Sequence, residues 1–143
     1  MRPLSIAILA LLAAPATLGA QNRSADAAAV VSRYYQAIDR GDFRTAYRSW
    51  GDNGAASGKT YAAFARGFAQ TARTRVALGR PTLPEGAAGS TYVEVPVDVR
   101  ATLKNGRRQH FRGTYVIRRV NGVDGATPAQ LRWHIDSARL RAV

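Results

Sequence analysis

The sequence predicts an α+β domain in which three N-terminal helices pack on a curved antiparallel sheet of about four strands. Three observations support this prediction. Apolar residues recur at steps of three and four as far as Phe68, which is the spacing of amphipathic helices. From Thr74 onward apolar and polar residues alternate, as in half-buried strands. A glycine-containing turn at residues 104–106 joins two alternating segments, so these two strands are expected to be antiparallel.

The first twenty residues have the layout of a secretory signal peptide. Arg2 supplies a positive charge, an apolar run follows from Leu4 to Ala14, and small residues precede Gln21. The run is shorter than the roughly twenty residues that a membrane span needs. We therefore predict a signal peptide at 1–20 and a single domain at 21–143, exported to the periplasm or secreted, with no membrane span after cleavage. Cleavage after Ala16 is a second option.

Composition limits the chemistry of the chain. Cysteine is absent, which excludes disulfides, zinc–thiolate sites and cysteine catalysis. The chain has 21 basic and 9 acidic residues and a net charge of +12. Such an excess attracts anionic partners, and an anionic envelope surface is therefore a candidate partner. An arginine-rich solvated surface without such a partner is the alternative, and nucleic acid is not expected for an exported chain.

Two helices are predicted first. Ser24 is expected to cap a helix over residues 25–40, in which Val31, Tyr34 and Ile38 share a face and which Gly41 ends. Asp42 is expected to open a short helix that runs to about Trp50.

One further helix and four strands complete the prediction. After turn residues at 51–58, Thr60 caps a third helix that contains Phe64 and Phe68. Strands are expected at 74–78, 90–103, 108–120 and 129–141, with a loop at 79–89.

The register of the central hairpin follows from its apolar residues. A three-residue loop at 104–106 pairs Val99 with Phe111, and Asp98 with Arg112 on the other face, whereas a two-residue turn would pair apolar with charged residues. Extending the rule to the last hairpin pairs Ile117 with Trp133 and Tyr115 with Ile135. The inward-facing residues are then expected to be Val93, Val95, Val97, Val99, Phe111, Tyr115, Ile117, Leu131, Trp133 and Ile135, with Gln109, Arg119, Ser137 and Arg139 nearer the strand ends.

A local pattern adds a family resemblance. Residues 34–43 (Tyr-Tyr-Gln-Ala-Ile-Asp-Arg-Gly-Asp-Phe), followed by Ala46, Tyr47 and Trp50, resemble the opening of nuclear transport factor 2-like domains. That superfamily also contains ketosteroid isomerase and the polyketide cyclases. The resemblance covers residues 25–141 and implies a cone-shaped, cystatin-like roll whose helices and inner sheet face enclose a pocket. It also implies that the outer sheet face is a candidate homodimer interface.

The pocket is expected to be lined by aromatic residues and to bind rather than to catalyse. Its predicted lining is Tyr34, Tyr35, Trp50, Phe68, Tyr115 and Trp133. None of the predicted inward residues is Asp, Glu or His, so the sheet offers no base of the kind that ketosteroid isomerase chemistry needs. We therefore predict a non-catalytic binding or assembly module for a small hydrophobic ligand, without a cofactor. The alternatives are a cofactor-independent isomerase or dehydratase using Asp52 with Tyr34 or Tyr35, and a cationic adaptor for anionic envelope polymers.

No metal site is expected. His110 and His134 are predicted to lie far apart on neighbouring strands, beyond shared coordination of one ion. Both are interpreted as surface or sheet-packing residues.

Overall fold

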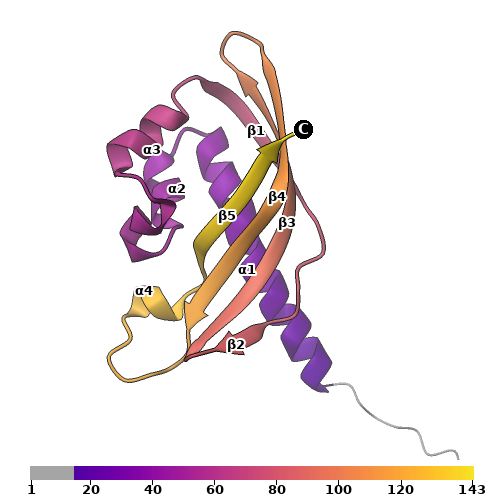
Figure 1. Ribbon diagram of the computed structural model, residues 1–143, viewed down its shortest axis with the longest axis vertical. Helices are drawn as coiled ribbons and strands as arrows, with labels where there is room; N and C mark the ends of the chain where they lie inside the picture. The colour runs from indigo at the N-terminus through magenta and orange to yellow at the C-terminus, as the bar shows by residue number, and fades with distance from the viewer. Residues whose placement is uncertain (1–14) are drawn as a thin grey trace, which may run out of the picture.

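The computed structural model describes residues 15–143, which form an α+β roll (Figure 1). Residues 1–14, most of the predicted signal peptide, lie outside the described part. The elements in chain order are α1 (Pro15–Asp39), α2 (Phe43–Arg48), the 3₁₀ helix η1 (Asp52–Ser57), α3 (Tyr61–Gly67), β1 (Thr71–Leu78), β2 (Glu85–Ala87), β3 (Ser90–Leu103), β4 (Arg108–Val120), α4 (Pro128–Leu131) and β5 (His134–Ala142). The predicted fold class is therefore confirmed.

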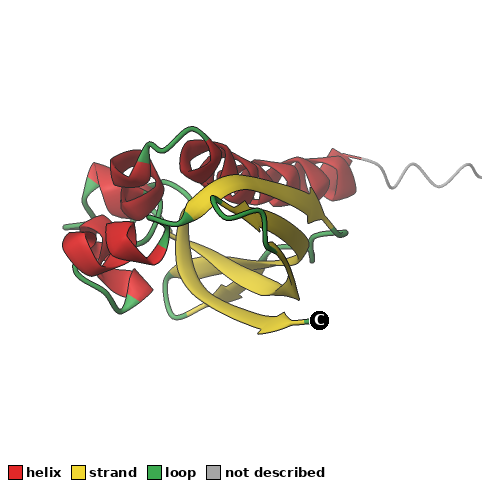
Figure 2. Cartoon of the chain, turned by 90° about the horizontal axis from the view of Figure 1, so that it is seen from above, coloured by secondary structure: helices red, strands yellow, loops and turns green. Residues whose placement is uncertain are grey.

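The sheet is antiparallel, with strands in the order β1, β3, β4, β5 and the short β2 paired to β3. Seen from above, the sheet curves beside α1, and the shorter helices cover one end (Figure 2). The core lies between α1 and the inner sheet face, where Val31 of α1 and Val93, Ile117 and Ile135 of the sheet are fully buried. None of the described helices is long and apolar enough to cross a membrane.

The start of α1 differs from the prediction. The helix begins at Pro15 rather than after Ser24, and Ser24 is a buried residue inside it. Instead of capping the helix, the Ser24 hydroxyl donates a hydrogen bond of 2.7 Å to the carbonyl oxygen of Thr82. The end of the helix is as predicted, because Gly41 adopts the left-handed conformation, with φ +76°.

The next two helices have the predicted caps. The Asp42 side chain accepts a hydrogen bond from the amide of Thr45, and Thr60 accepts one from the amide of Ala63. The second helix is shorter than expected, since α2 ends at Arg48. Trp50 leaves the helix to form a single β-bridge with Ile135, which ties this segment to β5.

The predicted register of the central hairpin is confirmed. Val99 pairs with Phe111, Val95 with Tyr115 and Val93 with Ile117, and Asp98 pairs with Arg112 on the other face. The three-residue loop is also as expected, with Gly106 in the left-handed conformation at φ +85°.

The last strand was predicted incorrectly at its start. Residues 128–131 form the helix α4, because Thr127 and Gln130 make a reciprocal capping box and Pro128 occupies the first turn. β5 therefore begins at His134, and Leu131, predicted to face inward, is 41% exposed.

The register of β5 is also shifted. Ile117 pairs with Ile135 rather than Trp133, and Tyr115 pairs with Ala138 rather than Ile135. A β-bulge opposite Val116 and Ile117 inserts one residue into β5. An extra residue reverses which side chains face each side of the sheet. Ala138 and Leu140 consequently contact the inner cavity described below, whereas Ser137 and Arg139, predicted to face inward, line a groove on the outer face.

Candidate ligand-binding cavity

A cavity of about 560 Å³ lies between the helices and the inner face of the sheet. Its wall is mostly apolar and draws on α1, η1, α3 and strands β1, β3, β4 and β5. The lining residues are Tyr34, Tyr35, Trp50, Ser57, Lys59, Phe64, Gly67, Phe68, Thr71, Thr74, Val99, Ala101, Gln109, Phe111, Tyr115, Ala138, Leu140 and Ala142. Cavities of this size and character accommodate small organic ligands.

The structure brings together five of the six residues proposed from sequence. Tyr34, Tyr35, Trp50, Phe68 and Tyr115 all line the cavity. The sixth, Trp133, lies in the turn between α4 and β5, where the guanidinium carbon of Arg119 is 5.1 Å from the centre of its ring. The two-residue register error accounts for this, because Ile135 occupies the place opposite Ile117 that the prediction gave to Trp133.

Two tyrosine hydroxyls form the polar centre of the wall. Tyr35 on α1 and Tyr115 on β4 are both buried, and their hydroxyl oxygens are 2.6 Å apart. Each hydroxyl has one O–H donor, and the hydrogen bond between them uses only one of the two. One O–H donor of the pair therefore remains for a third oxygen, and the hydroxyl of Tyr34, which also hydrogen-bonds with Tyr115, competes with a ligand for it.

Helical spacing and strand register explain why these rings meet. Tyr34 and Tyr35 follow Val30 and Val31 by one helical turn, so they continue the buried face of α1. Tyr34 contacts Tyr35, Trp50 and Tyr115 with ring centres 5.0–6.2 Å apart. Edge-on and tilted packing of this kind holds the rings in fixed positions.

All three tyrosines are neutral donors at physiological pH. Burial raises the pKa of Tyr35 to about 12. Burial, reinforced by the neighbouring Tyr35, raises the pKa of Tyr34 and of Tyr115 well above the ordinary value near 10. These hydroxyls can therefore donate hydrogen bonds but cannot serve as bases near neutrality.

One further donor lies at the wall. The indole Nε1 of Trp50 is buried and has no hydrogen-bond partner among the described residues. A buried donor without a partner costs free energy, which a ligand oxygen could offset.

The cavity lining contains no carboxylate and no imidazole among the described residues. Lys59 is its only formally charged group, and Thr74 already donates to the carbonyl oxygen of Tyr35. Asp52, the weak catalytic candidate from sequence, begins η1 and is exposed, and it does not line the cavity. The arrangement can bind and orient an oxygen atom, but it presents no base to a bound molecule.

The histidines also lie apart from the cavity lining. His110 contacts Asp98 on the outer sheet face, and His134 contacts the carbonyl oxygen of Arg132. Within residues 15–143 no group of three or more acidic or histidine side chains is placed to hold a metal ion.

Sequence reasoning missed the contribution of β5. Ala138, Leu140 and Ala142 line the cavity, although the extrapolated register placed this end of the strand differently. A signal was present in the sequence: apolar residues stand at 135 and then at 138, 140 and 142, so the two-residue period breaks between 135 and 138. Such a break is the mark of a β-bulge.

Comparisons with known proteins support the fold assignment. At the sequence level neither a protein-family model nor a curated protein matches the chain. Among solved structures, a candidate dehydratase of the nuclear transport factor 2-like family from Streptomyces avermitilis superposes with a TM-score of 0.55, at 17% identity, over 86% of this chain and 98% of that one. The chain therefore has the nuclear transport factor 2-like fold.

Two structures from Novosphingobium aromaticivorans are similar in the same way. A candidate aromatic ring hydroxylase gives a TM-score of 0.60 at 13% identity, covering 85% of this chain and 94% of its own. A candidate scytalone dehydratase gives 0.54 at 14% identity, covering 90% of this chain and 85% of its own. At such low identity the likeness concerns the fold alone, and function has to be argued from the site.

Proposed function

We propose that this protein is a binding module for a small, mostly apolar molecule that carries a hydrogen-bonding oxygen. The observation that supports this most directly is the buried hydroxyl pair of Tyr35 and Tyr115 in an otherwise aromatic and aliphatic cavity. Apolar walls supply affinity, and a few fixed polar groups set the orientation of the ligand. A ketone, phenol or alcohol on a cyclic hydrocarbon skeleton fits this combination.

The proposal favours binding over turnover because the described cavity lining offers no carboxylate or imidazole to remove a proton. Asp52 lies outside that lining. The tyrosines, held neutral by burial, can polarise a ligand oxygen but need a partner base to complete an isomerisation or dehydration.

Export is part of the proposal and rests on the pattern of the first twenty residues. The helix α1 is compatible with it, because residues 16–18 and 21–23 are exposed and, from residue 16 onward, Ser24 is the first buried residue. The core residues of the described part, from Ala27 onward, would all remain after cleavage at Ala20. Mass spectrometry of the protein from the periplasm or medium should find a chain that starts at Gln21. An intact chain confined to the cytoplasm would contradict export.

Tryptophan fluorescence tests the binding proposal, since Trp50 lines the cavity and Trp133 does not. A Trp133→Phe variant, in which Trp50 is the only tryptophan, should respond saturably to 4-tert-butylcyclohexanone. A Trp50→Phe variant, which reports from Trp133, should show only the linear response of collisional quenching. Equal responses from the two variants would contradict binding in the cavity.

The hydroxyl pair is tested with the same ketone. Either hydroxyl can donate to the ligand, so both are removed: adding Tyr35→Phe and Tyr115→Phe to the Trp133→Phe background should weaken binding about three- to tenfold, the value of one hydrogen bond. A matched change at Tyr47, whose hydroxyl donates to the carbonyl oxygen of Lys59 and is not part of the cavity lining, should leave the affinity unchanged.

A catalytic role is the second candidate. Two of the structures with the same fold are candidate dehydratases, and buried tyrosine donors are compatible with polarising a carbonyl group. This role needs a base, and Asp52 is the residue proposed from sequence. If turnover of a hydroxy-ketone is found, Asp52→Asn should abolish it. Full activity of that variant would rule out Asp52 as the base.

A further inference from the structure

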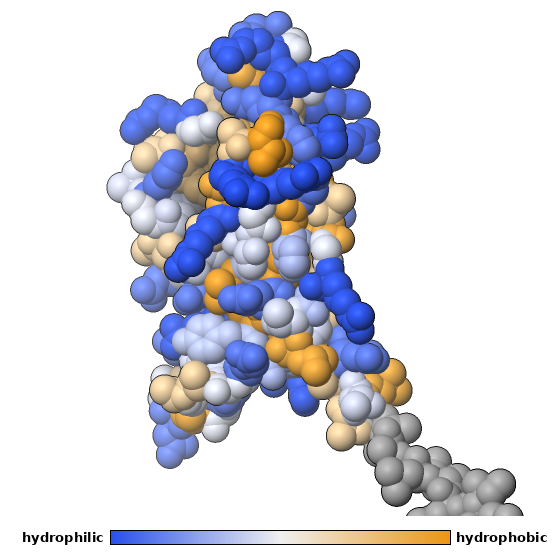
Figure 3. All heavy atoms as spheres, turned by 45° about the vertical axis from the view of Figure 1, so that its right-hand side comes forward, coloured by the Kyte–Doolittle hydropathy of each residue, from blue (hydrophilic) through white to orange (hydrophobic). Residues whose placement is uncertain are grey.

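The outer face of the sheet carries a cluster of arginines at the end where β3 and β4 are joined. Long hydrophilic side chains gather over this end of the molecule (Figure 3). Four strands contribute, and all the side chains are exposed. We call this surface the arginine face; its members are Arg73, Arg75, Arg100, Arg108, Arg112, Arg139 and Arg141.

Strand register places several of these arginines directly beside one another. Arg75 on β1 pairs with Arg100 on β3, and Arg112 on β4 pairs with Arg141 on β5. Like charges directly opposite each other on neighbouring strands destabilise a sheet. A surface that repeats such pairs carries a cost in stability, and binding of an anion would remove that cost.

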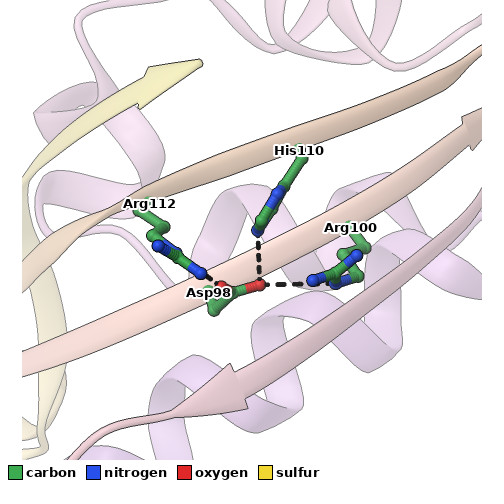
Figure 4. A network of polar contacts seen from close by, with 4 residues as sticks. All are labelled: Asp98, Arg100, His110 and Arg112. Carbon is green, nitrogen blue, oxygen red and sulfur yellow. Dashed lines mark hydrogen bonds and ion pairs between the residues drawn. The ribbon is translucent and has the colours of Figure 1, made fainter. Parts of the chain in front are cut away.

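Acidic residues offset little of this charge. Among the residues that pair across the sheet with members of the arginine face, Asp98 is the only carboxylate. It accepts one hydrogen bond of 2.8 Å from Nε of Arg112, and it lies 2.8 Å from His110 and 3.6 Å from Arg100 (Figure 4). No ion pair is found for Arg73, Arg75, Arg108, Arg139 or Arg141 within residues 15–143.

The surface is also hollowed. A groove of about 530 Å³ runs over β3, β4 and β5, and Arg112, Arg139 and Arg141 line it. Thr114, Ser137 and one carboxylate, that of Glu94, lie between them. Side-chain hydroxyls between the arginines add neutral hydrogen-bonding groups. This groove lies across the sheet from the aromatic cavity, and the two meet only at Leu140 of the edge strand β5.

We propose that the arginine face binds a linear acidic polysaccharide, with carboxylates bound by the arginines and sugar hydroxyls bound in the groove. Arginine forms paired hydrogen bonds with carboxylates in a fixed planar geometry, which lysine cannot do. Neighbouring strands are about 4.8 Å apart, so the rows of arginines present closely spaced cations to a chain with regularly repeated anions.

Other occupants fit the surface less well. Single-stranded nucleic acid binds by stacking its bases on aromatic side chains. None of the residues that pair across the sheet with the arginine face is Phe, Tyr or Trp. Membrane surfaces bind through apolar anchors together with charge, and Leu140 is the only large exposed apolar residue of the groove. A symmetric second copy would place arginines against the same arginines.

The test compares two triple variants of the chain with the same loss of charge. One carries Arg75→Gln, Arg139→Gln and Arg141→Gln on the arginine face. The control carries Arg33→Gln, Arg48→Gln and Arg66→Gln on α1, α2 and α3, where all three residues are exposed. Both variants should keep the far-ultraviolet circular dichroism of the original chain. Binding to polygalacturonate is measured by calorimetry at low and moderate salt, with uncharged dextran as the reference polymer.

We expect the face variant to bind polygalacturonate at least tenfold more weakly and the control variant to lose less than twofold. Equal losses would show that net charge alone attracts the polymer, and would overturn the proposal. Tighter binding of an oligothymidylate or of phosphatidylglycerol vesicles would overturn the class of partner. Dimerisation that the face variant abolishes, seen by analytical ultracentrifugation without polygalacturonate binding, would assign the face to a second copy instead.

Discussion

The hydroxyl groups of Tyr35 and Tyr115, which are 80 residues apart in sequence, lie 2.6 Å from each other in the buried wall of the cavity. This contact joins α1 to the centre of the sheet. Both side chains are buried, so this hydrogen bond is shielded from water. Structure and proposed binding therefore depend on the same pair of oxygens.

The first prediction concerns the coupling of this pair. Tyr35→Phe or Tyr115→Phe alone should reduce the free energy of unfolding by about 1–3 kcal/mol, because each leaves a buried hydroxyl without its partner. The double variant should lose clearly less than the sum, since neither hydroxyl remains. Urea denaturation of the four proteins measures this cycle. Additivity within about 0.3–0.5 kcal/mol would show that the two hydroxyls are independent.

The second prediction concerns alkaline pH. Tyr35 has a pKa of about 12 in the folded chain, and the pKa values of Tyr34 and Tyr115 are also raised, whereas unfolded tyrosine titrates near 10. Above pH 10 the unfolded chain therefore releases protons that the folded chain retains, so stability falls as pH rises from about 10 to 12. Each such tyrosine contributes up to about 1.4 kcal/mol per pH unit.

Denaturation curves between pH 8 and 12 measure this effect. Stability should be unaffected by these tyrosines from pH 8 to 9, and Tyr35→Phe should make the fall above pH 10 less steep. An unchanged slope in the variant would contradict the raised pKa of Tyr35.

The third prediction concerns the close approach of β4 and β5. A Cβ atom on Gly113 would collide with the carbonyl oxygen of Arg139, so Gly113→Ala must displace the backbone of β5. We expect a loss of about 1–3 kcal/mol, and weaker ketone binding because β5 supplies one wall of the cavity. Gly122→Ala is the matched control, since nothing lies within 4 Å of the added atom. Equal effects of the two changes would contradict this account.

The fourth prediction concerns Asp98. Hydrogen bonds from Arg112 and then His110 hold the pKa of this carboxyl below its usual value, so it is ionised at neutral pH. Asp98→Asn should therefore strengthen polygalacturonate binding about two- to tenfold, because it releases Arg112 and removes a negative charge from the arginine face. The affinity is measured by calorimetry under the salt conditions used above. Weaker binding would show that Asp98 is needed to position Arg112 for the polymer.

Local chemistry explains which elements could be predicted. Gly41, Asp42 and Thr60 act on their own neighbours in sequence, so the end of α1 and the starts of α2 and α3 followed from residue type. The β3–β4 register followed because alternating valines must meet apolar partners on the buried face.

The two main failures have different causes. Ser24 has the residue type of a cap, yet it is buried because Thr82, far away in sequence, accepts its hydrogen bond. The apolar pattern predicts Trp133 as an inward-facing strand residue. The capping box at Thr127 instead makes a helix, so β5 begins only at His134 and the Trp133 ring lies beside Arg119. The position of Ser24 does not follow from neighbouring residues, whereas the capping box of Thr127 and Gln130 is local chemistry that the strand prediction for 129–141 overlooked.

By itself the sequence determined the fold class, the helix ends at Gly41, Asp42 and Thr60, and the central hairpin, because these depend on local hydrogen bonds and on hydrophobic period. Only the tertiary structure decided which groups share the cavity and which share the outer face. The bulge opposite Val116 and Ile117 adds one residue to β5 and reverses its two faces, which sends Ala138 to the cavity and Arg139 to the groove. A bulge leaves one residue without its place in the hydrogen-bonded ladder, and packing of the two sheet faces offsets that loss of stability. Because this packing joins segments that are distant in sequence, local patterns do not reveal it.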